Sequence, residues 1–335
     1  MTRSIRTALA GVLAWRPDPL GVLASTARVV ERARHVRIDT EAIARAADTL
    51  AAAERRAPAW HRDELYFDGG PKSVAYVFLI DALNFCFWGE PRWTVRFRGR
   101  WLDGYWALAA ALTRGVSEEP RLLDANFLAD LDPAVLRRVL RGRGEIPLFE
   151  ARWRNARELG RVLRDRWRGD GTLLVAEAKR SAVGLARIVA ESFSSFDDVA
   201  LHEGREVRFL KRAQILAADL WGAFGGRGFG RFDDLDQLTA FADYKLPQVL
   251  RAWGVLRYDA ALARRVGRRT LLPAGCPEEV EIRAATVWAA ELLREALAER
   301  GQRLTSTEVD WLLWDAGQRR IAHMKPYHRT RTIYY

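Results

Sequence analysis

Apolar residues recur at helical spacing through long stretches of this chain, and this periodicity is the strongest constraint on its fold. The stretches 284–297 and 210–221 carry apolar side chains three or four residues apart, which is the pattern of an amphipathic helix. A third helical segment starts near Asp39 or Thr40, either of which can cap a helix. A fourth follows residues 305–308, whose sequence Thr-Ser-Thr-Glu has the form of a capping box. The sequence therefore predicts a protein that is mostly helical.

Only one segment has a clear strand pattern. Residues 93–98 largely alternate between apolar and polar side chains, and Gly99-Arg100 can turn the chain back into Trp101-Leu102 as a hairpin. Residues 206–209 form a weaker candidate strand. The chain has neither alternating strand–helix units nor a dinucleotide-binding glycine motif. The predicted fold class is mainly α with a small β element.

Size and charge limit the domain organisation and the partners. Of the 335 residues, 49% are hydrophobic, so we expect a single domain over residues 1–335 or two closely packed subdomains with the site between them. The 54 Lys and Arg residues outnumber the 43 Asp and Glu residues, which gives a net charge of +11 and favours anionic partners. Because acidic residues are interspersed and no basic tail exists, a small phosphate-bearing ligand fits this charge as well as a nucleic-acid polymer.

Cysteine and histidine usage argues against a metal site. Cys86 and Cys276 lie far apart, and the five histidines show no ligand spacing, so we expect no bound metal. The apolar run 74–80 ends at Asp81, far short of the roughly 20 residues that span a membrane. The basic and apolar start of the chain lacks the small-residue cleavage site of a signal peptide. These features predict a cytoplasmic protein.

Four segments place acidic or amide side chains beside aromatic ones. They are residues 81–88, 191–199, 241–249 and 311–315. Asp and Asn can read the edge of a purine-like base while an aromatic ring stacks on its face. Each segment also has a structural interpretation: an aromatic core around Asp81, a helix N-cap at Asp198, a surface pair of Asp243 with Lys245, and the flank of a helical stripe for Asp315.

Cleavage of an N-glycosidic bond requires side chains of these types. Its transition state resembles an oxocarbenium ion, which a fixed carboxylate near the anomeric carbon stabilises or attacks, while a second group holds or protonates the leaving base. The residues alone therefore indicate a carboxylate-dependent enzyme and leave its substrate open.

Several motifs resemble those of the queuosine salvage protein family. The longest is Phe-Ala-Asp-Tyr-Lys-Leu-Pro-Gln-Val-Leu at 241–250. The others are Leu-Asn-Phe-Cys-Phe-Trp at 83–88, Gly-Tyr-Trp at 104–106, Lys-Arg-Ala-Gln-Ile-Leu at 211–216, Glu-Val-Glu-Ile-Arg at 279–283, Leu-Trp-Asp at 313–315 and Ile-Tyr-Tyr at 333–335. They occur in the family's order from about Tyr76 to the end of the chain, whereas the earlier part matches loosely, through residues 34–39.

The resemblance implies an enzyme that hydrolyses queuosine 5′-monophosphate and releases queuine without a cofactor. It also implies a fold similar to helix-hairpin-helix DNA glycosylases, in which residues 246–250 occupy the place of the hairpin. There, Gln248 and Leu250 replace glycines that let backbone amides approach a DNA phosphate. The acid also precedes this segment instead of following it. Both departures favour a free nucleotide as the substrate.

The resemblance further suggests roles for individual residues. Asp243 is the expected catalytic carboxylate, with Asp198 as the alternative. Asp315 and Asn84 are candidates for binding the base, and Phe241, Phe87 and Trp88 for stacking on it. Trp314 and His35 are further candidates for substrate binding. The candidates for binding the phosphate are Lys211, Arg212, Lys245, Arg329, Arg331 and Tyr335, and each basic residue among them also suits a structural ion pair or a helix terminus.

Two alternative functions stay open. The first is a nucleic-acid-binding protein or a glycosylase that acts on a polymer, which the net charge favours and the missing hairpin glycines disfavour. The second is a helical scaffold in which Asp198, Asp243 and Asp315 are unrelated surface charges. The oligomeric state is open as well.

Overall fold

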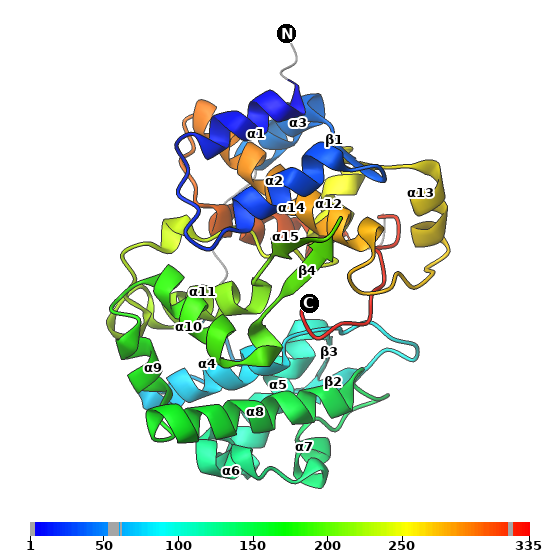
Figure 1. Cartoon of the computed structure of the whole chain (residues 1–335). Coiled ribbons are helices and arrows are strands. Elements are labelled where there is room, and N and C mark those ends of the chain that lie inside the picture. Colours follow the sequence, from blue (N-terminus) through cyan, green and yellow to red (C-terminus); the bar gives the residue numbers. More distant parts are fainter. Residues whose placement is uncertain (1–3, 53–59, 61, 321–323) are drawn as a thin grey trace. The chain divides into compact units, whose positions relative to one another are not determined.

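The computed structural model describes residues 4–52, 60, 62–320 and 324–335 (Figure 1). Its internal contacts divide the chain into two units. The first unit contains Met1–Pro58, Asp198–Lys211 and Asp236–Arg331, and the second contains Ala59–Asp197, Arg212–Leu235 and Thr332–Tyr335. Each unit is therefore assembled from three separate segments of the chain.

The first unit consists of helices with short strands between them. Its elements are α1 (Ile5–Leu13), α2 (Val22–Arg32), β1 (Val36–Ile38), α3 (Thr40–Ala51), β4 (Val199–His202), β5 (Arg205–Arg208), α12 (Leu246–Ala252), β6 (Leu256–Tyr258), α13 (Ala260–Gly267), α14 (Pro277–Glu299) and α15 (Ser306–Arg320). A 3-10 turn, η4 (Leu235–Gln237), lies at the boundary between the units in the sequence.

Helix α14 forms the core of this unit. Residues 279–293 are all buried, and α14 packs against α2, α3, α12 and α15. Charged side chains on such a helix need partners, because an unpaired buried charge is costly. Glu281 accepts backbone N–H groups from the segment before β1, Arg283 pairs with Asp198, and Glu291 pairs with Arg16. The helix predicted at 284–297 is confirmed and extends further toward its N-terminus.

The second unit is also mostly helical. Its elements are α4 (Pro71–Leu83), β2 (Thr94–Phe97), β3 (Arg100–Asp103), α5 (Gly104–Glu118), η1 (Pro120–Leu123), α6 (Ala125–Ala129), α7 (Pro133–Val139), α8 (Phe149–Trp167), α9 (Gly171–Glu177), α10 (Ala182–Ser192), η2 (Ser194–Phe196), α11 (Lys211–Phe224) and η3 (Gly228–Gly230). The apolar helix α4 is buried from Val77 to Leu83 and packs against α5, α8 and α9. Helix α11 confirms the helix predicted at 210–221.

The strands form small antiparallel pairs. In the described residues β1 pairs with β6, β2 with β3, and β4 with β5. The β2–β3 register places Arg96 opposite Trp101, which confirms the predicted hairpin, and β5 confirms the weaker strand candidate. The prediction of a mainly α fold with a small β element is therefore correct.

Two helix starts follow the capping chemistry of the sequence. The Asp39 side chain accepts the N–H groups of Glu41 and Ala42 at the start of α3. At α15, Glu308 N–H donates to the Thr305 hydroxyl at 3.2 Å, and the Glu308 carboxylate accepts Thr305 N–H at 2.8 Å. This reciprocal pair is the predicted capping box. None of the described helices combines the length and apolar character needed to cross a membrane.

Candidate active-site residues

Asp243 lies in the loop that leads into α12, and its carboxylate is held by the backbone. Its Oδ1 accepts the N–H groups of Lys245 at 2.7 Å and Leu246 at 2.9 Å. These bonds fix the orientation of a half-buried carboxylate. Both use the same oxygen, and among the described residues Oδ2 makes no hydrogen bond, so it can face a ligand. Asp243 contacts the backbone N–H of Lys245, whereas the structural alternative was a surface pair of the two side chains.

A second acid, Asp310, holds the same segment and was not identified from the sequence. The Phe241 N–H donates to its Oδ1 at 2.7 Å. Asp310 is 5% exposed, and burial raises the pKa of its carboxyl well above the usual range. The Phe241 N–H and the Lys211 ammonium oppose this rise, whereas the charge of Asp243 adds to it. The only signal in the sequence for a buried Asp310 was its position directly after Val309, which begins a predicted apolar stripe.

Asp198 has very different surroundings from Asp243. It is 1% exposed and receives two hydrogen bonds from the Arg283 guanidinium, at 2.9 and 2.5 Å. A third, from the backbone N–H of Lys211, reaches its Oδ2 at 3.2 Å. Arg283 also stacks on Phe209, with 3.9 Å from its guanidinium carbon to the ring centroid. The carboxylate therefore neutralises a buried arginine and contacts the first N–H of α11, which favours a structural role.

The remaining candidates of the first unit are spread over several segments. Lys211 is 6% exposed. Half-buried candidates are Lys245, Trp314 and Asp315. The Lys245 ammonium lies 5.6 Å from the centroid of the Tyr327 ring. Asp315 and Trp314 share α15 with Asp310. Arg331 is exposed and Arg329 is half-buried.

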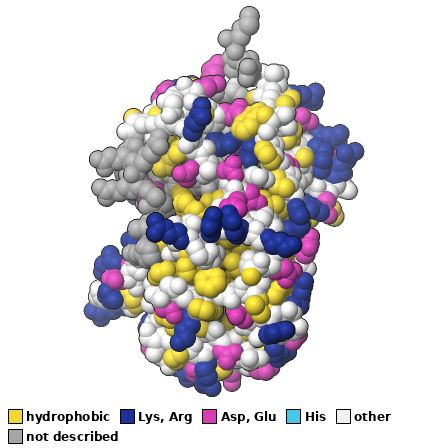
Figure 2. Space-filling view, turned by 90° about the vertical axis from the view of Figure 1, so that its left-hand side faces the viewer, with side chains coloured by type: hydrophobic (Ala, Val, Ile, Leu, Met, Phe, Trp, Pro, Cys, Tyr) yellow, Lys and Arg dark blue, Asp and Glu magenta, His cyan; other side chains and the backbone are white. Residues whose placement is uncertain are grey.

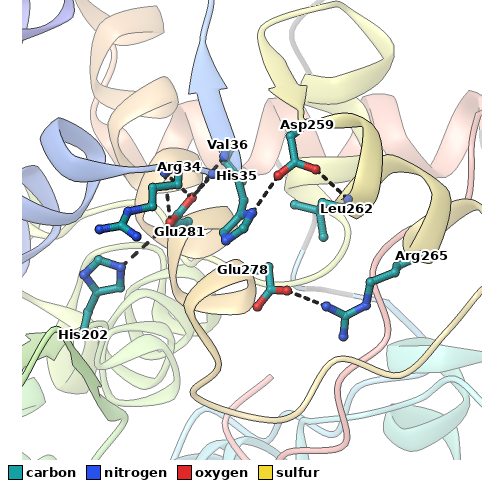
Figure 3. Close-up of polar contacts among 9 residues, drawn as sticks. All are labelled: Arg34, His35, Val36, His202, Asp259, Leu262, Arg265, Glu278 and Glu281. Carbon is teal, nitrogen blue, oxygen red and sulfur yellow. Dashed lines mark hydrogen bonds and ion pairs between the residues drawn. The ribbon is translucent and has the colours of Figure 1, made fainter.

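His35 belongs to a polar cluster around Glu281 (Figure 3). Its Nδ1 lies 2.6 Å from Asp259 Oδ2, and this hydrogen bond raises the pKa of the imidazole. The carboxylate of Glu281 accepts the N–H groups of Arg34, His35 and Val36, at 2.7–3.1 Å. These contacts hold the segment before β1 against α13 and α14.

In the second unit, the buried Arg212 donates to backbone carbonyls. Its guanidinium donates to the carbonyls of Asp81 and Ala82, each at 2.8 Å, and to that of Ser195. It is 1% exposed and lies near the rings of Phe85 and Phe196, with centroid distances of 5.1 and 4.7 Å. The last carbonyls of α4 have no partner within the helix and need other donors, which Arg212 supplies. This use of its donors argues against the predicted phosphate contact.

The segment after α4 carries the other candidates of the second unit. Asn84 ends the helix and is half-buried, as is Phe87, whereas Trp88 is 6% exposed. The Cys86 N–H donates to the backbone carbonyl of Tyr335 at 2.9 Å. The end of the described chain is thereby joined to residues 84–88, which brings Tyr335 next to motif residues almost 250 positions earlier in the sequence.

The comparisons with known proteins agree with the motifs. A family model described as queuosine salvage protein matches residues 65–335. A protein of Sphaerobacter thermophilus is 53% identical over 95% of this chain and 98% of its own length. A protein of Mus musculus is 37% identical over 95% of this chain and 99% of its own length. Both are named queuosine 5′-phosphate N-glycosylase/hydrolase. The chain therefore belongs to the queuosine salvage protein family.

Proposed function

We propose that this protein hydrolyses the N-glycosidic bond of queuosine 5′-phosphate and releases queuine for salvage into tRNA. The observation that carries this proposal is the similarity, over almost the entire chain, to relatives named for this activity. In the reaction the bond between the ribose C1′ and the base breaks, and its electron pair goes to the base. Water supplies a hydroxyl group to C1′ and a proton to the base, so the products are ribose 5-phosphate and queuine.

Asp243 is the carboxylate that we assign to the anomeric carbon. Positive charge develops on the sugar as the bond breaks, and a fixed negative group at that position lowers the barrier. The two backbone N–H bonds to Oδ1 support this assignment, because they hold the carboxylate in place before substrate arrives and leave Oδ2 to face the sugar. Asp198 is better suited to a supporting role, since its oxygens already bind Arg283 and Lys211.

For the base we assign the half-buried side chains of the motifs. In the first unit, Trp314 is a candidate for stacking and Asp315 for the base edge or the side arm of queuine. In the second unit, the corresponding candidates are Phe87 and Asn84. Phe241 and Trp88 are 4% and 6% exposed, so their rings contribute less open surface than Phe87 does.

For the phosphate, Lys245 and Arg331 are the stronger candidates. Lys245 is half-buried next to the Asp243 loop, and Arg331 is exposed. Lys211 is nearly buried, and it contributes positive charge close to the Asp310 carboxyl. The buried Tyr335 side chain, 2% exposed, is a weaker candidate.

We further propose that the fold of this protein is related to that of helix-hairpin-helix glycosylases. Residues 246–250 form most of the short helix α12, with Pro247 in its first turn. The Gln248 side chain donates to the Lys325 carbonyl at 2.8 Å, so this position is used internally where a hairpin glycine would approach a polymer phosphate. On the face in Figure 2, basic side chains are interspersed with acidic and hydrophobic ones. These features favour a free nucleotide over a polymer, and we expect no salt-sensitive binding to duplex DNA.

We also propose that the enzyme acts in the cytoplasm. Cys86 and Cys276 lie far apart in the sequence and give little support for a disulfide framework, which suits a reducing compartment.

The direct test is incubation of the purified protein with queuosine 5′-phosphate, followed by chromatography for free queuine. The wild-type protein should release queuine, and Asp243→Asn should lower kcat by about 100-fold or more, the size of effect seen when a group that stabilises transition-state charge is removed. Asparagine keeps an oxygen for the N–H groups of Lys245 and Leu246, so the variant should remain folded.

Asp132→Asn is the matched control. Asp132 accepts the Ala134 N–H at the start of α7, and Asp243 accepts the Lys245 N–H just before α12, so both substitutions alter a carboxylate that binds a backbone N–H two residues ahead. Asp132→Asn should keep the wild-type rate. Equal rates for Asp243→Asn and wild type would remove Asp243 from the mechanism, and no release by the folded wild-type protein would refute the proposed function.

A further inference from the structure

The candidate site contains two carboxyl groups in unequal environments. Asp243 is half-buried, and its carboxylate receives two backbone N–H groups. Asp310 is 5% exposed and receives one, from Phe241. Burial disfavours a charged carboxylate and hydrogen bonds from N–H groups favour it. The environment of Asp243 therefore suits an anion, and that of Asp310 suits a neutral acid.

The charges around Asp310 do not reverse this difference. Among the described residues, no basic side chain lies within ion-pair distance of Asp310. Asp243, from the loop before α12, and Lys211, at the start of α11, are the charged groups that act on it, with opposite effects. On its own helix Glu308 bonds to Thr305, and from α14 Glu291 bonds to Ser306. The effect of the Lys211 ammonium on Asp310 is thus opposed by that of Asp243.

We propose that Asp310 is a positioning residue that works as the protonated partner of Asp243. One oxygen of Asp310 holds the Phe241 N–H, and the other carries the proton. This keeps the loop from Phe241 to Asp243 in place and leaves Asp243 as the only negative charge of the pair. Two neighbouring carboxylates rarely ionise together, so a neutral Asp310 allows Asp243 to remain charged at the anomeric carbon. The inference rests on the proposed function for its catalytic consequence.

The test uses Asp310→Asn. The asparagine side chain keeps the oxygen that accepts the Phe241 N–H, but it cannot ionise. Because the variant imitates the protonated acid, its kcat at pH 7 should lie within tenfold of the wild-type value. At high pH the wild-type protein should lose kcat/KM as Asp310 ionises, and Asp310→Asn should lack this alkaline limb. Glu308→Gln, which removes an acid from the first turn of the same helix, should keep the limb.

The free energy of unfolding provides a readout that does not require activity. The folded-state pKa of Asp310 is raised, so above the unfolded value near 4 the folded protein binds more protons than the unfolded chain, and stability falls as pH rises toward the folded pKa. The urea midpoint of Asp310→Asn minus that of the wild type should therefore grow as the pH rises from 5 to 8. If this variant does not fold, Asp310→Ser keeps a hydroxyl acceptor and serves in its place.

Two results would overturn the inference. One is a folded Asp310→Asn protein whose kcat falls more than tenfold at pH 7, because the ionised carboxylate would then be required. The other is a variant whose pH profile and urea midpoints follow those of the wild type at every pH. If the wild-type protein releases no queuine, the proposed function fails, but the urea comparison still decides whether Asp310 holds a proton.

Discussion

Asp198 and Asp243 look alike in the sequence, since each is an acid that follows an aromatic residue by two positions. Their partners in the structure are different. Asp198 is paired with Arg283, 85 residues away, while Asp243 is held by N–H groups two and three residues ahead. A carboxylate that is already neutralised by a buried guanidinium is less suited to stabilise a developing cation. At the scale of single residues, the identity of the partner distinguishes the surroundings of these two acids.

This difference leads to a prediction on stability. Asp198→Asn removes the closer of two carboxylates that pair with the buried Arg283 guanidinium, the other being Glu279 at 3.8 Å, and this loss should lower the free energy of unfolding by about 3–5 kcal/mol. Urea denaturation followed by circular dichroism measures the change. Glu203→Gln is the control, because it removes one partner of the exposed Arg32–Glu203 pair and should have little effect. Equal losses in the two variants would show that the buried pair has no special importance.

At the scale of elements, close packing between two helices limits the size of the side chain that a contact position can hold. Gly160 lies in α8 where this helix meets α6. A Cβ atom at this position would be 2.2 Å from the Ala129 nitrogen and 2.5 Å from the Ala125 carbonyl oxygen, and both are backbone atoms that cannot rotate away. Helix propensity alone would favour alanine in α8 by about 1 kcal/mol.

We therefore expect Gly160→Ala to destabilise the protein despite the better propensity. Separating two packed backbones should cost about 1–3 kcal/mol or more, which exceeds the gain in propensity. Gly11→Ala in α1 is the control, since a Cβ there has no atom within 4 Å. That variant should be neutral or slightly more stable. Urea midpoints of both variants test this, and a stabilising Gly160→Ala would mean that α6 and α8 can move apart at little cost.

At the scale of the whole molecule, the net charge of +11 should act on an anionic substrate. Many arginines are paired with acids, including Arg141 with Glu118 and Arg121 with Glu119, so part of the positive charge is offset locally. A positive protein still attracts a nucleotide monophosphate, and dissolved salt screens this attraction within about 10 Å at 0.1 M.

The resulting prediction concerns KM. Between 50 and 500 mM NaCl, KM for queuosine 5′-phosphate should rise about 3–10-fold, with kcat nearly constant, because screening weakens binding and not the chemical step. Initial rates at several salt concentrations measure this, with sucrose of equal osmolality as the control. A KM that does not change with salt would mean that the charge of the protein contributes nothing to capture of the phosphate.

The sequence by itself determined the local features. The helices at 210–221 and 284–297, the cap at Asp39, the capping box at Thr305 and the β2–β3 hairpin were all predicted correctly. Each depends on residues only a few positions apart, so the information lies within a short window of the chain. The motifs also identified the family, because several of them occur in a fixed order.

The tertiary structure decided the surroundings of the buried polar residues. Arg212, a candidate for the phosphate, donates to carbonyls as far as 131 residues away, and Asp310, which was not identified from the sequence, holds Phe241 from 69 residues away. Whether a charge is solvated, paired or kept neutral depends on which distant segments pack around it. Residue type and spacing do not contain that information, so only the folded chain distinguishes Asp243, Asp198 and Asp310.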